Sequence, residues 1–183
     1  MFPEINSALR LDKHSIENKR INIVQAPSTD GSFFLHHFIS LAAKSNYNIL
    51  IIAFEQTIGH FHGVGMKLGY DLLKLQKKGQ AIFYDVLKNS HMAYMCDANH
   101  SEIADSIFDF DTNLTRAIPR LSSAIKQKMN EFKDQSIPSF VFIDKLSVLL
   151  SLNVKLSSVI SFIIDLQFFV EEKNGSLGMI QKH

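Results

Sequence analysis

The sequence is poor in several features that would point to particular classes of protein. Its 183 residues include a single cysteine, Cys96. This excludes an internal disulfide framework and a four-cysteine zinc site, and agrees with a reducing compartment. No Gly/Ser-rich or Pro-rich stretch divides the chain, so we expect a single domain over residues 1–183 with a short N-terminal arm, residues 1–19.

An excess of charge of one sign is also missing. The formal net charge is +1, which gives no bulk electrostatic reason to bind nucleic acid or an acidic membrane surface. The first residues lack the basic and apolar regions of a secretory signal. The most apolar stretch, residues 146–170, is interrupted by Lys155 and Asp165, so we expect a buried amphipathic helix there and no membrane span.

Apolar runs of strand length alternate along the chain with segments of helical period. We expect helices on both faces of a mostly parallel sheet, because this alternation is typical of α/β proteins. The predicted strands are 21–25, 49–54, 79–85 and 138–144, and the predicted helices are 32–45, 60–75, 114–132 and 156–172. Residues 97–111 are polar and acidic and give no firm prediction.

The loop after the first predicted strand has the spacing of a phosphate-binding loop, G-x-x-x-x-G-K-[ST], without its chemistry. Gly31 matches the second glycine, but Ala26 replaces the first glycine, Ser32 the lysine and Phe33 the magnesium-binding hydroxyl. An aromatic ring cannot ligate a hard cation. We therefore predict a strand-to-helix turn capped by Asp30 or Ser32, with no catalytic residue, metal or bound cofactor.

The predicted strand 138–144 has the form of a Walker B strand, four apolar residues followed by Asp144. In P-loop enzymes the aspartate at this position holds magnesium. Ligand sites in parallel sheets lie beyond the carboxyl ends of the strands, so Asp144 and the degenerate loop should lie at the same edge. Glu55 follows the second strand, where a water-activating carboxylate could stand, but no lysine would hold a phosphate for it.

Histidines invite a metal hypothesis, which their spacing does not favour. His36 and His37 point about 100° apart on a helix, and no cysteine or carboxylate at zinc-site spacing supports His60 and His62. Packing and surface hydrogen bonds are the expected roles.

Two other features carry weak signals. Cys96 lies outside any nucleophile-elbow pattern. The cluster Lys74, Lys77 and Lys78 is either a solvated helix end or part of an RNA-binding surface.

Several segments carry a more specific resemblance. These are TDGSFFLHHF at 29–38, GVGMKLG at 63–69 and GQAIF at 79–83, together with the N-terminal residues 1–6 and the later segment 143–152. In this combination the chain closely resembles the family of the sixth Elongator subunit. The likeness covers most of the first 90 residues and resumes around 138–170.

The resemblance implies a RecA-like fold with degenerate catalytic motifs and a non-catalytic role. It implies partners too: the fourth and fifth Elongator subunits in a heterohexameric ring, the catalytic Elongator subcomplex that modifies the wobble uridine of tRNA at carbon 5, and tRNA bound through the assembled ring. The modification chemistry, which depends on acetyl-CoA and a radical iron–sulfur centre, belongs to another subunit. The expected location is the cytoplasm, with the nucleus as a second location.

The resemblance also implies further strands after the helix that ends near Glu172, and we expect these C-terminal strands of the family to be missing here. Their loss would expose apolar strand edges. Two other functions stay open from the residues alone. One is an atypical P-loop ATPase or kinase that takes its lysine from elsewhere, and the other is a stand-alone RNA-binding module.

Overall fold

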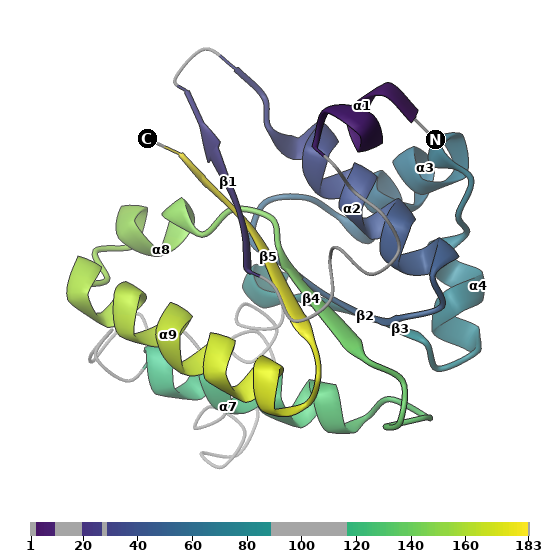
Figure 1. The fold of residues 1–183 in the computed structure, drawn as a ribbon. Coiled ribbons are helices and arrows are strands. Elements are labelled where there is room, and N and C mark those ends of the chain that lie inside the picture. Colours follow the sequence, from purple (N-terminus) through teal and green to yellow (C-terminus); the bar gives the residue numbers. More distant parts are fainter. Residues whose placement is uncertain (1–2, 10–19, 27–28, 89–116, 183) are drawn as a thin grey trace.

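Five strands form a sheet in the order β1-β5-β4-β2-β3, and every neighbouring pair is parallel (Figure 1). The computed structural model describes residues 3–9, 20–26, 29–88 and 117–182. The strands are β1 (Arg20–Gln25), β2 (Asn48–Ala53), β3 (Ala81–Asp85), β4 (Ser139–Ile143) and β5 (Ser176–Lys182).

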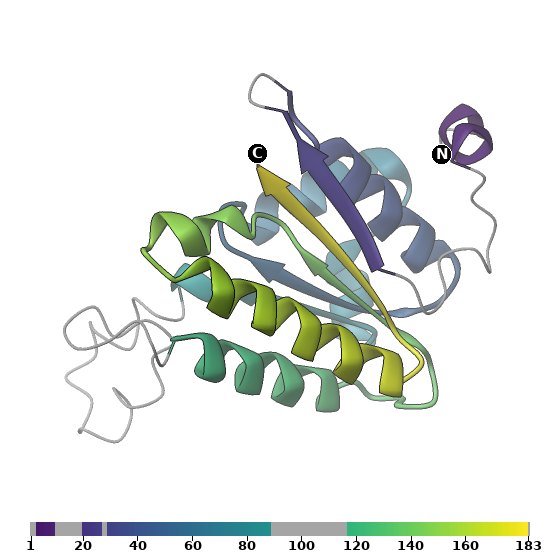
Figure 2. The ribbon, with the colours of Figure 1, turned by 60° about the vertical axis from the view of Figure 1, so that its left-hand side comes forward.

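Helices cover both faces of this sheet, which confirms the predicted α/β class. One face carries α2 (Ser32–Lys44), α3 (Ile58–Leu68) and α4 (Leu72–Lys77), and the other carries α7 (Ala117–Asn130), α8 (Ser147–Ser151) and α9 (Leu156–Glu172), as Figure 2 shows. A short helix, α1 (Pro3–Ala8), lies within the predicted N-terminal arm. No helix in the described part of the chain is long and apolar enough to cross a membrane.

The two central strands divide their side chains between two cores. All residues of β2 and β4 are buried. Ile49 and Ile51 pack with the α2 side, whereas Leu50 and Ile52 pack with the α7 and α9 side, because successive side chains of a strand point to opposite faces. This alternation explains why the sequence of each central strand reads as an unbroken apolar run.

The predicted helix 60–75 is wrong, since the structure has two helices there. Gly69 ends α3 in the left-handed region, with φ of 82°. Tyr70 donates its backbone N–H to the Gly65 carbonyl, and the Asp71 side chain then caps α4 by accepting from the Lys74 N–H at 3.0 Å. A glycine at a helix C-terminus followed by a capping aspartate is a stop and start signal, which the apolar periodicity across 60–75 obscured.

Strand β5 was not predicted, although it is an interior strand of the sheet, between β1 and β4. Its sequence contains Gly178, which weakens a strand pattern. The glycine fits because a Cβ there would lie 3.0 Å from the Phe142 ring, which is itself stacked on Phe140 at a centroid distance of 4.3 Å. Packing between strands therefore explains a residue that local propensity disfavours.

Several expectations concern residues outside the described part of the chain: Cys96, the segment 97–111, and the first residues of the predicted helix 114–132. Within the described part, β1 has no strand on its outer side, and Val24 on it is 54% exposed. One strand, β5, does follow Glu172, where the sequence analysis expected none.

Candidate functional site

The carboxyl ends of β1, β4 and β2 surround a cavity of about 290 Å³. Both degenerate motifs contribute to its lining: the phosphate-binding loop through Asp30 and Ser32, and the Walker B-like strand through Asp144. They meet because β5 alone separates β1 from β4 in the sheet. The remaining lining residues are Gln25, Leu35, His36, Glu55, Gln56, His60, Phe61, Lys145 and Ile180.

The loop after β1 places a carboxylate where a phosphate-binding loop places its anion. Asp30 Oδ1 accepts a hydrogen bond from the Ser32 backbone N–H at 2.9 Å. This N–H opens α2, and in P-loop proteins such helix-terminal groups face the phosphates. Hydrogen bonds from the backbone and then the side chain of Ser32 hold the pKa of Asp30 below its usual value. The chain thus supplies its own anion beside this helix terminus. The predicted cap, Asp30 or Ser32, is wrong, because the N-cap residue is Gly31 and the Asp30 side chain binds the Ser32 N–H from the position before the cap.

Gly31 is required by packing and not by an unusual backbone angle. Its φ is −86°, which any residue can adopt. A Cβ at this position would lie 2.9 Å from Cγ2 of Ile23 on β1. The glycine therefore lets the loop pass close over the strand.

Phe33 and Ala26 contribute to the turn. The Phe33 ring is 38% exposed and is stacked on His37, with ring centroids 6.4 Å apart. The Ala26 carbonyl accepts from the Thr29 N–H at 3.0 Å and from its hydroxyl at 3.1 Å, and the Gln25 amide donates to the Thr29 carbonyl. These contacts close the loop on itself.

Asp144 acts as a clamp between strands. Its side chain is buried, and its Oδ1 accepts from the Phe54 N–H at 2.8 Å while Oδ2 accepts from Glu55 and Gln56 at 3.1 and 3.0 Å. Burial raises the pKa of Asp144 above its usual value, and these backbone hydrogen bonds oppose the rise. Both oxygens are committed to the loop between β2 and α3, in contrast to a Walker B aspartate turned toward magnesium.

The remaining charges of the cavity form an ion pair. Lys145 donates to both carboxylate oxygens of Glu55. Glu55 therefore stands where sequence analysis placed it, but it is held by the lysine beside it. The lining carries three carboxylates, of Asp30, Glu55 and Asp144, and one ammonium group, of Lys145, so the cavity has an excess of negative charge.

The four candidate histidines lie in different surroundings. His36 is 2% exposed, its ring lies 4.8 Å from Phe61 and 5.5 Å from His60, and burial lowers its pKa to about 4. His37 bonds to Asn6 of α1 at 2.8 Å, and His62 lies 3.6 Å from Asp71. Among residues 3–9, 20–26, 29–88 and 117–182, no three His, Cys, Asp or Glu side chains are grouped to hold a metal ion.

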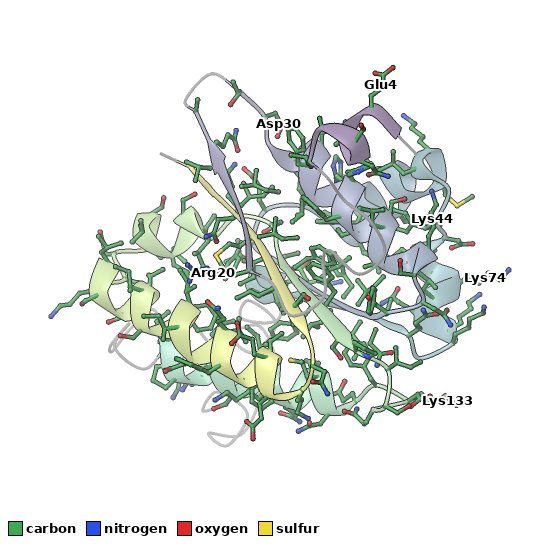
Figure 3. All side chains as sticks on the ribbon, viewed as in Figure 1. Glu4, Arg20, Asp30, Lys44, Lys74 and Lys133 are labelled. Atoms are coloured by element: carbon green, nitrogen blue, oxygen red, sulfur yellow. The ribbon has the colours of Figure 1, made fainter. Side chains whose placement is uncertain are left out.

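A basic surface lies away from this cavity, and sequence analysis found only part of it. Lys74 and Lys78 share a hollow with Lys44 from α2, and Lys78 lines a second hollow with Lys133, which follows α7. Figure 3 shows Lys44, Lys74 and Lys133 on the same side of the molecule. Lys44 and Lys133 join the cluster through tertiary contacts, which no local sequence pattern displays.

Comparison with known proteins places these features in a family. Residues 2–182 match the family model described as "Elongation complex protein 6". The chain belongs to this family. It is 31% identical to Elongator complex protein 6 of Mus musculus over 163 residues and 28% identical to that of Homo sapiens over 175 residues. These alignments cover 88% and 89% of the chain but 61% of each relative, so this family member spans about three fifths of their length.

A solved structure supports the fold of this Elongation complex protein 6 family member. The chain is similar to a KaiC-like protein from the hyperthermophilic archaeon Pyrococcus horikoshii, with a TM-score of 0.60 and 12% sequence identity. The match covers 91% of this chain and 64% of the archaeal chain. Together with the parallel five-stranded sheet, this confirms the predicted RecA-like α/β fold.

Proposed function

We propose that this chain is a non-catalytic accessory subunit of the Elongator complex. The observation that carries the proposal is the Asp30 carboxylate on the Ser32 N–H, at the helix terminus where a working loop would hold phosphate. A lysine is also missing from the loop, and Asp144 uses its oxygens to bind backbone. Fold and cavity are retained while each group that would do phosphoryl chemistry has another task.

Charge supports the same conclusion. Two like charges 4 Å apart near a protein surface repel by about 4 kcal/mol at an effective dielectric constant of 20. A nucleotide phosphate placed beside Asp30 would meet such repulsion, and Lys145 offers little compensation because Glu55 already binds it. We therefore propose that the cavity binds no nucleoside triphosphate.

The partners follow from the family. We propose that the chain assembles with the fourth and fifth Elongator subunits in a RecA-like heterohexameric ring, which supports modification of the wobble uridine of tRNA by the catalytic subcomplex. The proposed location is the cytoplasm, with the nucleus as a second location. Support comes from the family match over residues 2–182 and from the RecA-like fold.

Co-expression with the fourth and fifth Elongator subunits tests the assembly. Affinity purification through a tag on this chain should recover both partners at mild salt, and the three chains should then elute together in size-exclusion chromatography. Elution of the chain without either partner would refute the proposed assembly.

Nucleotide binding tests the cavity separately. The native chain should neither bind a fluorescent ATP analogue saturably nor hydrolyse ATP, and either result would contradict the non-catalytic role. Asp30→Ala frees the Ser32 N–H and removes a negative charge, so it should raise affinity for pyrophosphate. The control is Asp71→Ala, which removes the N-cap carboxylate of α4, away from the cavity, and should leave pyrophosphate binding there unchanged.

A direct contact with RNA is the second candidate function, favoured by the lysines that meet around α4. Each phosphate contact steepens the fall of affinity with salt. Lys74→Glu combined with Lys78→Glu should weaken tRNA binding and flatten its salt dependence, measured by filter binding. Lys155→Glu, before α9 on the opposite face of the sheet, should change neither quantity. Equal effects of both changes would refute a specific surface.

A further inference from the structure

The cavity beyond the carboxyl ends of β1, β4 and β2 keeps a surplus of negative charge. Three carboxylates and one ammonium group line it, and that ammonium group, of Lys145, is bound to Glu55. Asp30 is exposed and takes part in no salt bridge of the described residues. Since hydrogen bonds from Ser32 hold its pKa below the usual value, Asp30 is charged at neutral pH. The cavity therefore favours a cation.

A buried histidine in the wall of the cavity also lacks a hydrogen-bond partner. His36 lines the cavity and is 2% exposed, and no described residue bonds to its buried Nδ1. Burial lowers the pKa of His36 to about 4, so the ring is neutral at pH 7 and one of its nitrogens can accept a hydrogen bond. Buried polar groups are normally paired. The unpaired nitrogen therefore points to a ligand that donates hydrogen bonds.

The walls of the cavity select among cations. The ring of His36 lies 4.8 Å from that of Phe61 and 5.5 Å from that of His60, and Leu35 and Ile180 add apolar surface. A planar guanidinium group is weakly hydrated and stacks on aromatic faces, whereas an ammonium group is a strongly hydrated point charge. In the described part of the chain no three side chains are grouped to hold a metal ion. Guanidinium fits this lining best.

We propose that this cavity binds a guanidinium group, with the rings of His36 and Phe61 as its apolar wall and the carboxylates of Asp30 and Glu55 as its anionic partners. A carboxylate has about four acceptor sites, so the bonds already made by these two leave room for further donors. A volume of about 290 Å³ lies at the small end of ligand pockets, which suits a group of side-chain size. This site rests on the proposed function in one respect, since it requires a cavity that nucleotide phosphate does not occupy.

Isothermal titration calorimetry on the whole chain tests the chemistry, with N-acetyl-arginine methylamide as the probe. The arginine compound should bind saturably at pH 7. The corresponding citrulline compound has nearly the same shape without the charge, so it should bind about tenfold more weakly, and the lysine compound should also bind more weakly. Absence of saturable binding, or equal binding of the arginine and citrulline compounds, would overturn the proposal.

Variants locate the binding in the cavity. Asp30→Asn keeps an oxygen for the Ser32 N–H but removes the charge, and should weaken binding of the arginine compound about tenfold. His36→Phe keeps a ring but removes the acceptor nitrogen, and should weaken binding about fivefold. The control is Asp85→Asn, which changes an aspartate that accepts the Lys88 backbone N–H after β3, outside the lining of this cavity, and should leave binding unchanged. Equal effects of the Asp30 and Asp85 changes would refute the site.

A guanidinium group could come from a free small molecule or from an arginine side chain of a partner protein, and the co-purified complex with the fourth and fifth Elongator subunits distinguishes them. If a partner supplies the group, the complex should not bind the arginine compound and Asp30→Asn should weaken assembly. If a small molecule supplies it, the complex should bind the compound as the chain alone does, and assembly should not change. Both results agree with a guanidinium site and differ only in the source.

The guanidinium site and the proposed function fail separately. A chain that binds neither the arginine compound nor the fluorescent ATP analogue would refute the guanidinium site and leave the exclusion of nucleotide intact. Saturable binding of the ATP analogue would refute that exclusion, whatever the arginine compound does.

Discussion

At the scale of single residues, Asp144 shows how a catalytic position can become a structural one. It follows a Walker B-like strand, yet it accepts three backbone hydrogen bonds from residues 54–56. A carboxylate that satisfies several buried N–H groups stabilises the fold, because each unsatisfied group would cost about 1–3 kcal/mol.

Replacing Asp144 with Ala should therefore destabilise the protein by about 3 kcal/mol, since three N–H groups lose their acceptor at once. Urea unfolding followed by circular dichroism measures this change. Glu55→Ala breaks only a partly exposed ion pair with Lys145 and should cost under about 1 kcal/mol. Equal stability losses in the two variants would show that Asp144 is not a clamp.

His36 gives stability a dependence on pH. Burial lowers its pKa from 6.5 to about 4, so between these values the unfolded chain binds a proton that the folded chain excludes. The contribution of His36 to the free energy of unfolding is then fully present above pH 6.5. It is lost as pH drops toward 4, by up to about 3 kcal/mol at 1.4 kcal/mol per pH unit. His60 and Asp30 face the same ring and shift its pKa in opposite directions.

His36→Phe should weaken the dependence of the unfolding free energy on pH, because the phenylalanine ring can still pack on Phe61 but cannot be protonated. Unfolding free energies at pH 7, 5.5 and 4.5 measure the difference between native and variant chains. A variant that loses stability with falling pH as steeply as the native chain would assign the slope to other groups.

At the scale of elements, most of the alternation of strands and helices along the chain was predictable from sequence. The predicted helix 156–172 has the bounds of α9, and β2 and β4 agree with their apolar runs to within a residue or so. The errors arose where a local signal was weak or ambiguous. Gly69 and Asp71 divide a continuous helical period, and β5 is defined by its neighbours on both sides. The site was also predictable only in part. The positions of Asp30 and Asp144 after parallel strands placed them at the same edge of the sheet, but the sequence could not show which groups they bind.

Gly69 offers a test of the helix division. Its φ of 82° lies in a region that alanine adopts only with strain of about 1 kcal/mol. Gly69→Ala should destabilise the protein by about that amount, while Gly69→Asn, which tolerates the left-handed region better, should cost less. Thermal unfolding of both variants compares them. A stability gain with alanine, as expected inside a continuous helix, would contradict the observed break between α3 and α4.

At the scale of the whole molecule, the sheet depends on a strand that sequence analysis overlooked. β5 pairs with β1 on one side and with β4 on the other, and it contributes Leu177 and Met179 to one core and Ile180 to the other. Nothing else in the described part of the chain joins β1 to the sheet. The strand before the Asp30 loop is thus linked to β4, and so to Asp144, through pairing with β5, while α2 after the loop packs on the sheet.

Removing residues 176–183 should therefore prevent stable folding, since β1 loses its neighbouring strand and both cores lose buried side chains. Heteronuclear NMR should then show collapsed amide dispersion, and urea unfolding should lose its cooperative transition. Removing residues 1–9 is a control of similar length. It deletes α1, whose Asn6 contacts His37, and should leave cooperative unfolding in place. A shortened chain without β5 that still unfolds cooperatively would mean that β1 and the cavity residues are held by contacts other than the strand between them.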